Sequence, residues 1–260
     1  MNNKISYRFK TTSLANNQII WVTLPTFDLR PDQQKEFDAI LKQLQHTHKK
    51  KAIIFDLRGN QGGNSEYGSR ILEALFGKQF VALKNCLAGQ RVYVDWRVSP
   101  GNLAHISYLS NLYKSPWLKQ VEEGLKHSVA QNSHYYREHS SATCGSENDF
   151  SQIHRPETQI AAVIDSSNVS AALDFIDELK LLDPNIKLIG QTTDADRLYM
   201  EVRRMSLPSG KGDFYFPIKV YRNRQRSDNQ PYTPDIEYND ISNTKALQEF
   251  IIKYIGNFDQ

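Results

Sequence analysis

A serine that follows a buried strand and opens a helix is the first candidate for chemistry. Residues 160–164 are apolar throughout, residues 165–168 form a polar turn, and Ser170 stands at the start of an apolar-periodic stretch. A helix N-terminus stabilises developing negative charge, and its first backbone N–H groups have no partner inside the helix. Ser170 could therefore be a nucleophile, with the N–H of Ala171 as a donor to an oxyanion.

The same turn has a simpler interpretation. Its residues Ser166, Ser167 and Asn168 are all good helix-capping residues, and capping explains the local pattern as well as catalysis does. The turn also lacks the GxSxG pattern, which argues against an α/β-hydrolase.

A glycine-rich stretch after an earlier apolar strand is the second candidate. Residues 52–57 are apolar apart from Asp56, and residues 56–64 read DLRGNQGGN. Glycine permits positive φ and close approach of another backbone. The N–H of Gly62 or Gly63 could therefore donate to an oxyanion. A tight strand–helix turn is the alternative, and spacing alone favours it. The stretch fits neither a phosphate loop nor a GxGxxG loop.

Charged side chains near the C-terminal end could bind substrate. Arg222, Arg224 and Arg226 alternate, so they would share one face of an extended segment. Such a face could hold the terminal carboxylate of a peptide. A solvated strand and loop is the alternative, and it is favoured here.

A nucleophilic serine needs a base, and histidines are the first residues to consider. Those in the weakly patterned middle of the chain are His105, His127, His134, His139 and His154. Any of them could serve as the base, although polar surface residues are the simpler interpretation. A metal site is weaker still; its candidate ligands would be His46 and His48, or His134, His139 and Cys144. We expect no cofactor.

The frame that must position these candidates is an α/β fold. Apolar runs predict buried strands at residues 19–24, 52–57, 160–164 and 187–190, and longer strands at about 199–207 and 214–221. Helical periodicity predicts helices after residue 31, from about residue 65, over 169–182 and from about residue 244. Strands alternating with helices indicate a parallel sheet with crossover helices.

The middle of the chain interrupts this alternation. Residues 85–159 are rich in Tyr, Ser, His and Asn, with one amphipathic helix through Leu118, Val121 and Leu125. We interpret this stretch as an insertion or lid between two parts of one catalytic domain, residues 1–84 and 160–260.

Composition sets outer limits on function. The net charge of +3, from 32 basic and 29 acidic residues, is too balanced to imply a nucleic acid or a membrane as a required partner. Two cysteines, Cys86 and Cys144, are expected to be free thiols, with one disulfide as the alternative. The N-terminal residues carry no apolar signal core, so the chain as written is expected to be cytoplasmic, or exported if it derives from a longer precursor.

In chain order, the motifs resemble the catalytic core of the tail-specific (C-terminal-processing) serine proteases. The matching segments are residues 20–27, DLRGNQGG at 56–63, AVID at 162–165 leading to VSA at 169–171, LIG at 188–190 and TPDI at 233–236. The resemblance implies a crotonase/Clp-protease-like superhelix of strand–strand–helix units. It also implies peptide-bond hydrolysis through an acyl-serine, with a peptide or protein substrate.

Site residues carry over from this resemblance one by one. Ser170 matches the family nucleophile, while Gly62 or Gly63 and Ala171 match the residues that lend oxyanion N–H groups. Many members have a lysine base after the I-G pair, but residues 190–197 read GQTTDADR and contain none. The serine turn also departs from the family pattern.

A second, tricorn-like branch uses a serine, a histidine and an acidic residue. Asp228 is the nearest match to that acidic residue. The branch's histidine comes from an upstream domain, so a missing N-terminal domain or a partner chain would supply the base.

We therefore expect a serine peptidase core. The first alternative is a catalytically incomplete module of the same fold that binds peptides without cleaving them. The second is an acyl-thioester enzyme, since crotonase-type folds also use paired N–H groups; the Pro-Asp-Ile segment near the C-terminus argues against it.

Overall fold

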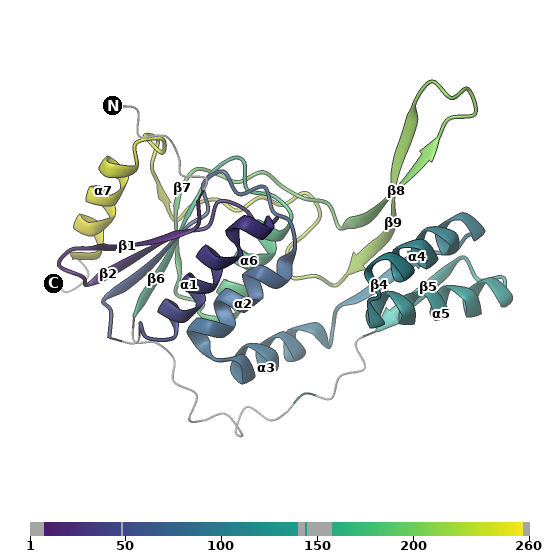
Figure 1. Cartoon of the computed structure of the whole chain (residues 1–260), viewed down its shortest axis with the longest axis horizontal. Coiled ribbons are helices and arrows are strands. Elements are labelled where there is room, and N and C mark those ends of the chain that lie inside the picture. Colours follow the sequence, from purple (N-terminus) through teal and green to yellow (C-terminus); the bar gives the residue numbers. More distant parts are fainter. Residues whose placement is uncertain (1–7, 48, 140–143, 145–157, 257–260) are drawn as a thin grey trace. The chain divides into compact units, whose positions relative to one another are not determined.

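The computed structural model describes residues 8–47, 49–139, 144 and 158–256. The chain forms two compact units. The first comprises residues 1–85, 145–196 and 229–260, and the second comprises residues 86–144 and 197–228. Figure 1 gives the course of the chain through the helices and strands of both units.

The first unit is built on a six-stranded sheet with the order β1-β2-β3-β6-β7-β10. Its strands are β1 (Lys10–Leu14), β2 (Ile19–Thr23), β3 (Ala52–Asp56), β6 (Gln159–Ile164), β7 (Lys187–Gly190) and β10 (Ile236–Glu237). All neighbours pair in parallel except β1, which is antiparallel to β2. Every residue of β2 and β3 is buried, as expected when helices cover both faces of a parallel sheet.

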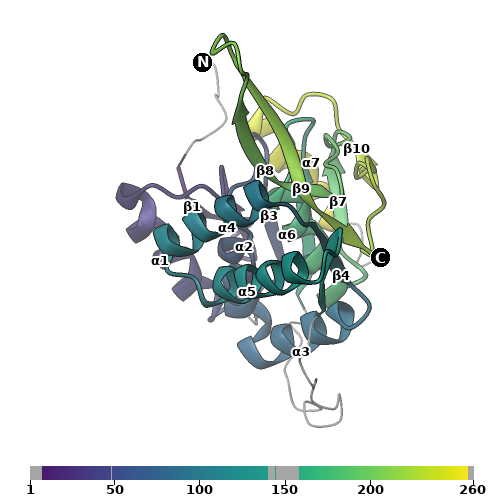
Figure 2. The same ribbon diagram turned by 90° about the vertical axis from the view of Figure 1, so that its right-hand side faces the viewer.

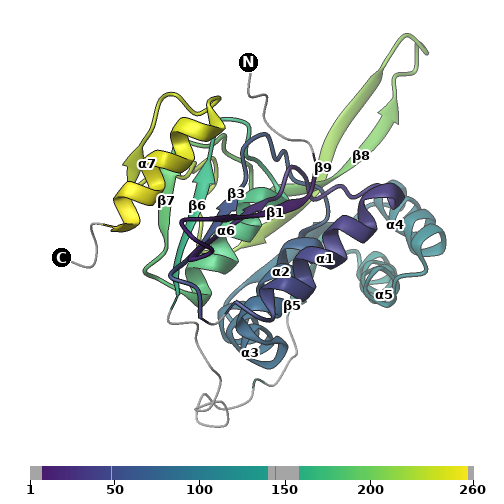
Figure 3. The same ribbon diagram turned by 60° about the vertical axis from the view of Figure 1, so that its left-hand side comes forward.

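Helices lie on both faces of this sheet (Figure 3). The helices of the first unit are η1 (Pro31–Gln33), α1 (Gln34–Leu44), α2 (Ser65–Phe76), α6 (Ala171–Leu182) and α7 (Thr244–Gly256), while α3 (Lys78–Gly89) continues into the second unit. On one face, Phe55 of β3 packs edge-on against Phe175 of α6, with ring centroids 5.3 Å apart. On the other face, Trp21 shares a core cluster with Leu247 of α7.

The parallel pairing of β3 with β6 brings both candidate loops to one edge of the sheet. Residues 57–64 leave the carboxyl end of β3, and residues 165–170 leave the carboxyl end of β6. Open α/β sheets bind their ligands at this edge.

The second unit has a four-stranded antiparallel sheet with the order β5-β4-β9-β8, seen with its two helices in Figure 2. Its elements are β4 (Tyr93–Arg97), α4 (Pro100–Tyr113), α5 (Pro116–Ala130), β5 (Tyr135–His139), β8 (Tyr199–Ser206) and β9 (Asp213–Arg222). A small core around Trp96, Ile106 and Val121 joins the sheet to both helices. Residues 197–228, which the sequence analysis grouped with the second part of the core, thus share a sheet with strands of the middle region.

Cys86 and Cys144 form a disulfide, with their Cα atoms 5.7 Å apart. The expectation of two free thiols is therefore wrong. The bond joins the first and last residues of the segment 86–144, so it closes the part of the chain that leaves the first unit. A sequence separation of 58 residues gives no local signal for this pairing.

Two further expectations concern metals and membranes. Within the described residues, no three His, Cys, Asp or Glu side chains are grouped so that they could hold a metal ion. Cys144, one of the proposed ligands, is in the disulfide. In the same residues, no helix combines the length and the apolar character needed to cross a bilayer.

Candidate active site

Ser170 has an unusual backbone conformation, with φ +57° and ψ −127°. Positive φ is uncommon for a non-glycine residue, and this ψ places Ser170 outside the left-handed helical region. Conformations of this kind cost energy and cluster at functional sites. The side chain is half-buried, and within the described part of the chain nothing hydrogen-bonds to its Oγ. The backbone conformation thus positions the hydroxyl, which makes no hydrogen bond to the described residues.

The helix that follows leaves a backbone donor unpaired next to this hydroxyl. α6 begins at Ala171, and the carbonyl of Ser170 accepts the N–H groups of Leu173 and Asp174. No described group accepts the N–H of Ala171. No side chain caps α6 either, so the interpretation of this turn as a helix cap is wrong.

The glycine loop packs directly against the serine turn. Gly62 has φ +93°, and a Cβ atom there would lie 2.7 Å from the carbonyl oxygen of Val169, 2.9 Å from Cβ of Ser170 and 2.9 Å from the nitrogen of Ala171. Only glycine fits this position. Gly63 is equally constrained, because a Cβ there would lie 2.3 Å from the backbone nitrogen of Asp28.

The two glycines differ in what their N–H groups do. The N–H of Gly62 donates to Oδ1 of Asn60 at 2.9 Å, so it is already occupied. The N–H of Gly63 has no acceptor within the described residues, and Gly63 is exposed. Of the two predicted oxyanion donors from this loop, Gly63 therefore has the free group.

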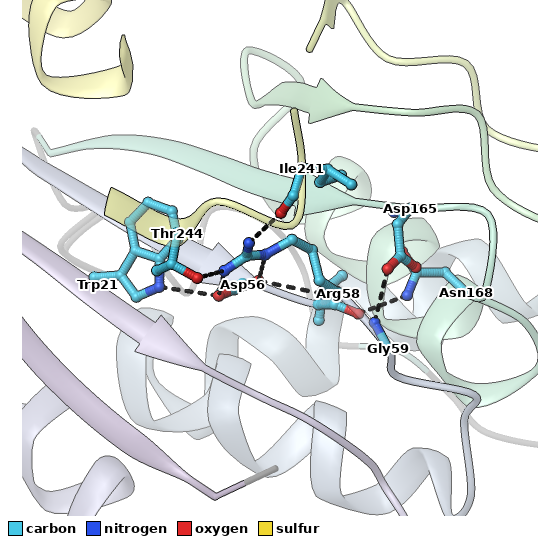
Figure 4. Close-up of polar contacts among 9 residues, drawn as sticks. Trp21, Asp56, Arg58, Gly59, Asp165, Asn168, Ile241 and Thr244 are labelled. Carbon is cyan, nitrogen blue, oxygen red and sulfur yellow. Dashed lines mark hydrogen bonds and ion pairs between the residues drawn. The ribbon is translucent and has the colours of Figure 1, made fainter. Parts of the chain in front are cut away.

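Asn168 and Asp165 fasten the two loops to each other (Figure 4). Asn168 is fully buried, and its Nδ2 donates to the carbonyls of Leu57 at 2.6 Å and Asn60 at 3.1 Å. Its Oδ1 accepts the N–H of Asp165 at 2.9 Å. Oδ2 of Asp165 accepts the N–H of Gly59, also at 2.9 Å. Sequence reasoning missed this role and considered Asn168 only as a helix cap.

The Asp-Leu-Arg part of the glycine motif has a structural role. The side chains of Asp56 and Arg58 are 4% and 1% exposed and form an ion pair at 2.7 Å. Trp21 donates its indole N–H to Asp56 at 3.1 Å, and Arg58 donates to the carbonyl of Ile241 and to Thr244 Oγ1. Figure 4 shows this buried network at the end of β3. It anchors the start of the glycine loop to Ile241, which precedes α7, and to Thr244, the first residue of α7.

The Pro-Asp-Ile motif closes the far side of the same sheet. Oδ2 of Asp235 accepts the N–H of Leu188 at 2.7 Å, and Ile236 pairs with Ile189. The motif therefore aligns β10 with β7 and carries no reactive group at the serine.

No described side chain supplies a base to Ser170. No histidine or lysine in the described residues hydrogen-bonds to its hydroxyl. Of the histidine candidates, His105, His127 and His134 belong to the second unit, and Nε2 of His105 lies 3.8 Å from Glu201. His154 and the side chain of His139 fall outside the described residues, as does His48, one of the candidate metal ligands.

Asp228 lies in the second unit and already has partners there. Its Oδ1 accepts the N–H of Leu198 at 2.9 Å, and its Oδ2 lies 3.8 Å from Arg197. Its assignment as the residue that orients a histidine stays a prediction.

The three arginines proposed to bind substrate, Arg222, Arg224 and Arg226, do not share one extended face. Their strand ends at Arg222, and Asn223 has φ +58°, which breaks the alternation expected from the sequence. Arg222 donates to Asp95 at 3.1 Å. Arg137 and then Arg222 lower the pKa of the Asp95 carboxyl by hydrogen bonding.

The other two arginines have different surroundings. Arg224 lies over the ring of Tyr221 at 5.4 Å, and Arg226 is buried. A role for these arginines in binding substrate stays a prediction.

Comparison with known proteins gives a family match over most of the chain. The model of Peptidase family S41 matches residues 18–238, a range that contains both loops. No curated protein sequence matches significantly.

Solved structures give the likeness in three dimensions. Mature CPAF complexed with lactacystin superposes with a TM-score of 0.55 at 14% identity, over 97% of this chain and 54% of that one. A lipoprotein from Streptococcus agalactiae gives 0.48 at 17% identity, over 97% and 70%. The photosystem II D1 C-terminal processing protease gives 0.42 at 12% identity, over 91% and 46%. The likeness to CPAF shows a shared α/β fold, and this chain spans about half of the CPAF chain.

Proposed function

The chain belongs to peptidase family S41, and from this premise we propose that it is a serine-type peptidase that hydrolyses peptide bonds through an acyl intermediate on Ser170. We also propose that the fold that positions Ser170 is the crotonase/Clp-protease-like superhelix of strand–strand–helix units. The order β2-β3-β6-β7, with parallel pairing throughout, supports that frame.

The reaction would proceed in two acyl-transfer steps. Oγ of Ser170 attacks the scissile carbonyl carbon while its proton passes to a base. The N–H groups of Ala171 and Gly63 would stabilise the oxyanion that forms. Collapse of this intermediate breaks the C–N bond, and the base returns its proton to the leaving amine. Water then hydrolyses the acyl-serine by the same route.

The base is the part of the mechanism that these residues do not supply. We propose that a histidine from another domain of the protein, or from a partner chain, fills this role. Asp228 would orient that histidine, in the manner of the tricorn-like branch.

The conformation of Ser170 is the observation that carries the proposal. A serine with φ +57°, an unbonded hydroxyl and a free N–H on the next residue is costly to maintain for packing alone. Gly62 packs against this turn so closely that no other residue would fit, which supports a site built from both loops.

Cleavage of an unstructured protein such as casein tests the proposal. Ser170→Ala should lower kcat/KM by at least about a thousandfold, because it removes the nucleophile and leaves only the oxyanion donors. Ser166→Ala is the matched control, since Ser166 is an exposed serine of the same turn. Equal cleavage by wild type and Ser170→Ala would overturn the proposal.

A second candidate function is peptide binding without cleavage. The absence of a base beside Ser170 within the described residues favours it. This candidate predicts saturable binding of extended peptides, measured by fluorescence anisotropy, with the peptides recovered intact after long incubation. Turnover by the wild-type chain would exclude it.

A further inference from the structure

The exposed large hydrophobic side chains of the described residues all lie in the second unit. They are Tyr108, Leu112, Tyr113, Trp117, Tyr135, Tyr199, Val202, Met205, Leu207, Phe214 and Tyr215. Five are tyrosines and one is a tryptophan, the residue types that combine an apolar ring with a polar group. A concentration of this kind marks an interaction surface.

The densest part of this surface is the distal end of the β8–β9 hairpin. Met205, Leu207, Phe214 and Tyr215 are 45–60% exposed and lie within four residues of the turn at 208–212. Figures 1 and 2 show this end of the hairpin standing clear of α4 and α5, the helices of its own unit. We call residues 204–215 the hairpin tip.

One face of the tip is apolar, while the other carries the ion pair of Arg204 and Asp213 together with Tyr215. Met205 is paired with Phe214, so their side chains share one face of the ribbon. Tyr215 is paired with Arg204 and lies on the other face. Nearer its base the same hairpin behaves differently, because Ile218 is buried in the core beside Ile106.

Charge is distributed unevenly between the units. The second unit has 14 Lys and Arg residues against 7 Asp and Glu, a net charge of +7. The first unit has 18 against 22, a net charge of −4. The small net charge of the whole chain therefore conceals a strongly basic unit that also carries the exposed apolar side chains.

The hairpin tip carries a cation of its own. Arg204 forms an ion pair with Asp213 at 2.8 Å. Lys211, in the turn, is exposed and has no partner within the described residues. The apolar side chains of the tip are thus flanked by a free ammonium group.

We propose that the hairpin tip inserts shallowly into the surface of a bilayer that contains anionic lipids. An apolar face flanked by charged side chains suits the surface of a bilayer, where apolar side chains can enter the acyl boundary while Arg204, Lys211 and Asp213 stay among the headgroups. Lys211 and the net positive charge of the unit complement acidic headgroups. Insertion to headgroup depth keeps the edges of the hairpin hydrated, so its unpaired backbone groups are not stranded in hydrocarbon.

Vesicle co-sedimentation of the full chain tests this inference. The probes are phosphatidylcholine vesicles with and without about one third phosphatidylglycerol. We expect binding to the anionic vesicles, weak binding to the neutral ones, and release at high salt. The double substitution Leu207→Ser and Phe214→Ser should weaken binding at least about tenfold, because half-exposed apolar side chains lose their burial in lipid. Lys211→Gln should weaken it about fivefold.

Matched controls separate insertion from other effects. Lys245→Gln removes an exposed lysine of the first unit and should leave vesicle binding unchanged. All these positions are exposed, so the thermal unfolding of each variant should match the wild type. The proposal is overturned if the wild-type chain stays in the supernatant with anionic vesicles, or if the tip variants bind as the wild type does. It is also overturned if light scattering without lipid shows a dimer that the double substitution dissociates, because the tip would then serve a second copy of the chain.

Discussion

Ser170 and Gly62 form a pair in which each constrains the other. Ser170 holds a backbone conformation that costs on the order of 1–3 kcal/mol. Gly62 approaches the turn closely enough that its missing side chain is required. The sequence analysis singles out each residue by its position, Ser170 before a predicted helix and Gly62 after a predicted strand. It does not indicate that they touch, because 108 residues separate them.

Substitution of glycine measures this contact. Gly62→Ala should destabilise the fold by roughly 3 kcal/mol or more, because it adds a steric clash to the strain of positive φ. Gly77 has the same φ of +93°, but no atom lies within 4 Å of the place that a Cβ would take there. Gly77→Ala should therefore cost only about 1 kcal/mol.

Urea unfolding followed by circular dichroism gives both values. Equal losses of unfolding free energy in the two variants would show that Gly62 does not pack against the serine turn as described.

At the scale of elements, two buried side chains, Asp165 and Asn168, join the carboxyl ends of β3 and β6. Asn168 links the turn after β6 to two carbonyls of the loop after β3. Its hydrogen bonds lie between the strand ends and the serine, so we consider it a positioning residue for Ser170.

Replacing this residue should affect both the stability of the fold and the reactivity of the site. Asn168→Ala leaves the carbonyl of Asn60 and the N–H of Asp165 without partners, while the carbonyl of Leu57 keeps its bond from the N–H of Asn60, and it should cost on the order of 3 kcal/mol. We expect kcat, or the rate of labelling of Ser170 by a fluorophosphonate, to fall at least about tenfold at a temperature where the variant is fully folded.

A buried asparagine of the second unit serves as the control. Asn102 is also buried and makes comparable hydrogen bonds, to Arg97 and Arg203. Asn102→Ala should destabilise the protein while the labelling rate of Ser170 is unchanged. If the labelling rate of Ser170 fell equally in both variants, Asn168 would contribute to stability and not to the positioning of Ser170.

The main strands and helices of the first unit follow from the sequence, as do α5, β8 and β9 of the second unit, whereas α4, β4 and β5 do not. Strands at 52–57, 160–164 and 187–190 are predictable because buried parallel strands are continuous apolar runs. α4 escaped prediction because exposed Tyr108 and Leu112 blur its periodicity. β4 escaped because it carries Asp95 and Arg97, and the partners of Asp95 lie far away in the sequence.

At the scale of the molecule, the disulfide is the covalent link that closes the segment 86–144. Replacing both cysteines by serine should destabilise the second unit by up to about 4 kcal/mol, because a closed loop of this length restricts the unfolded chain. Hydrogen exchange should show faster opening of β4 and β9, while amides of β3 and β6 keep their protection.

Wild-type protein in a reducing agent should reproduce this pattern. Unchanged exchange in β4 and β9 would contradict a stabilising role for the bond.

The two cysteines and the small net charge of the whole chain, both read from the sequence, did not reveal the disulfide or the basic unit. Both depend on which segments fold together.

Mass spectrometry after treatment with a fluorophosphonate probe tests the central claim most directly, since this reagent modifies only a serine that acts as a nucleophile in an oxyanion site. We expect one adduct per chain, located on the peptide that contains Ser170 and absent from Ser170→Ala. An unmodified Ser170 would contradict the assignment of Ser170 as a nucleophile if the chain is folded, the domain or partner chain that supplies the histidine is present, and a trypsin control is fully labelled.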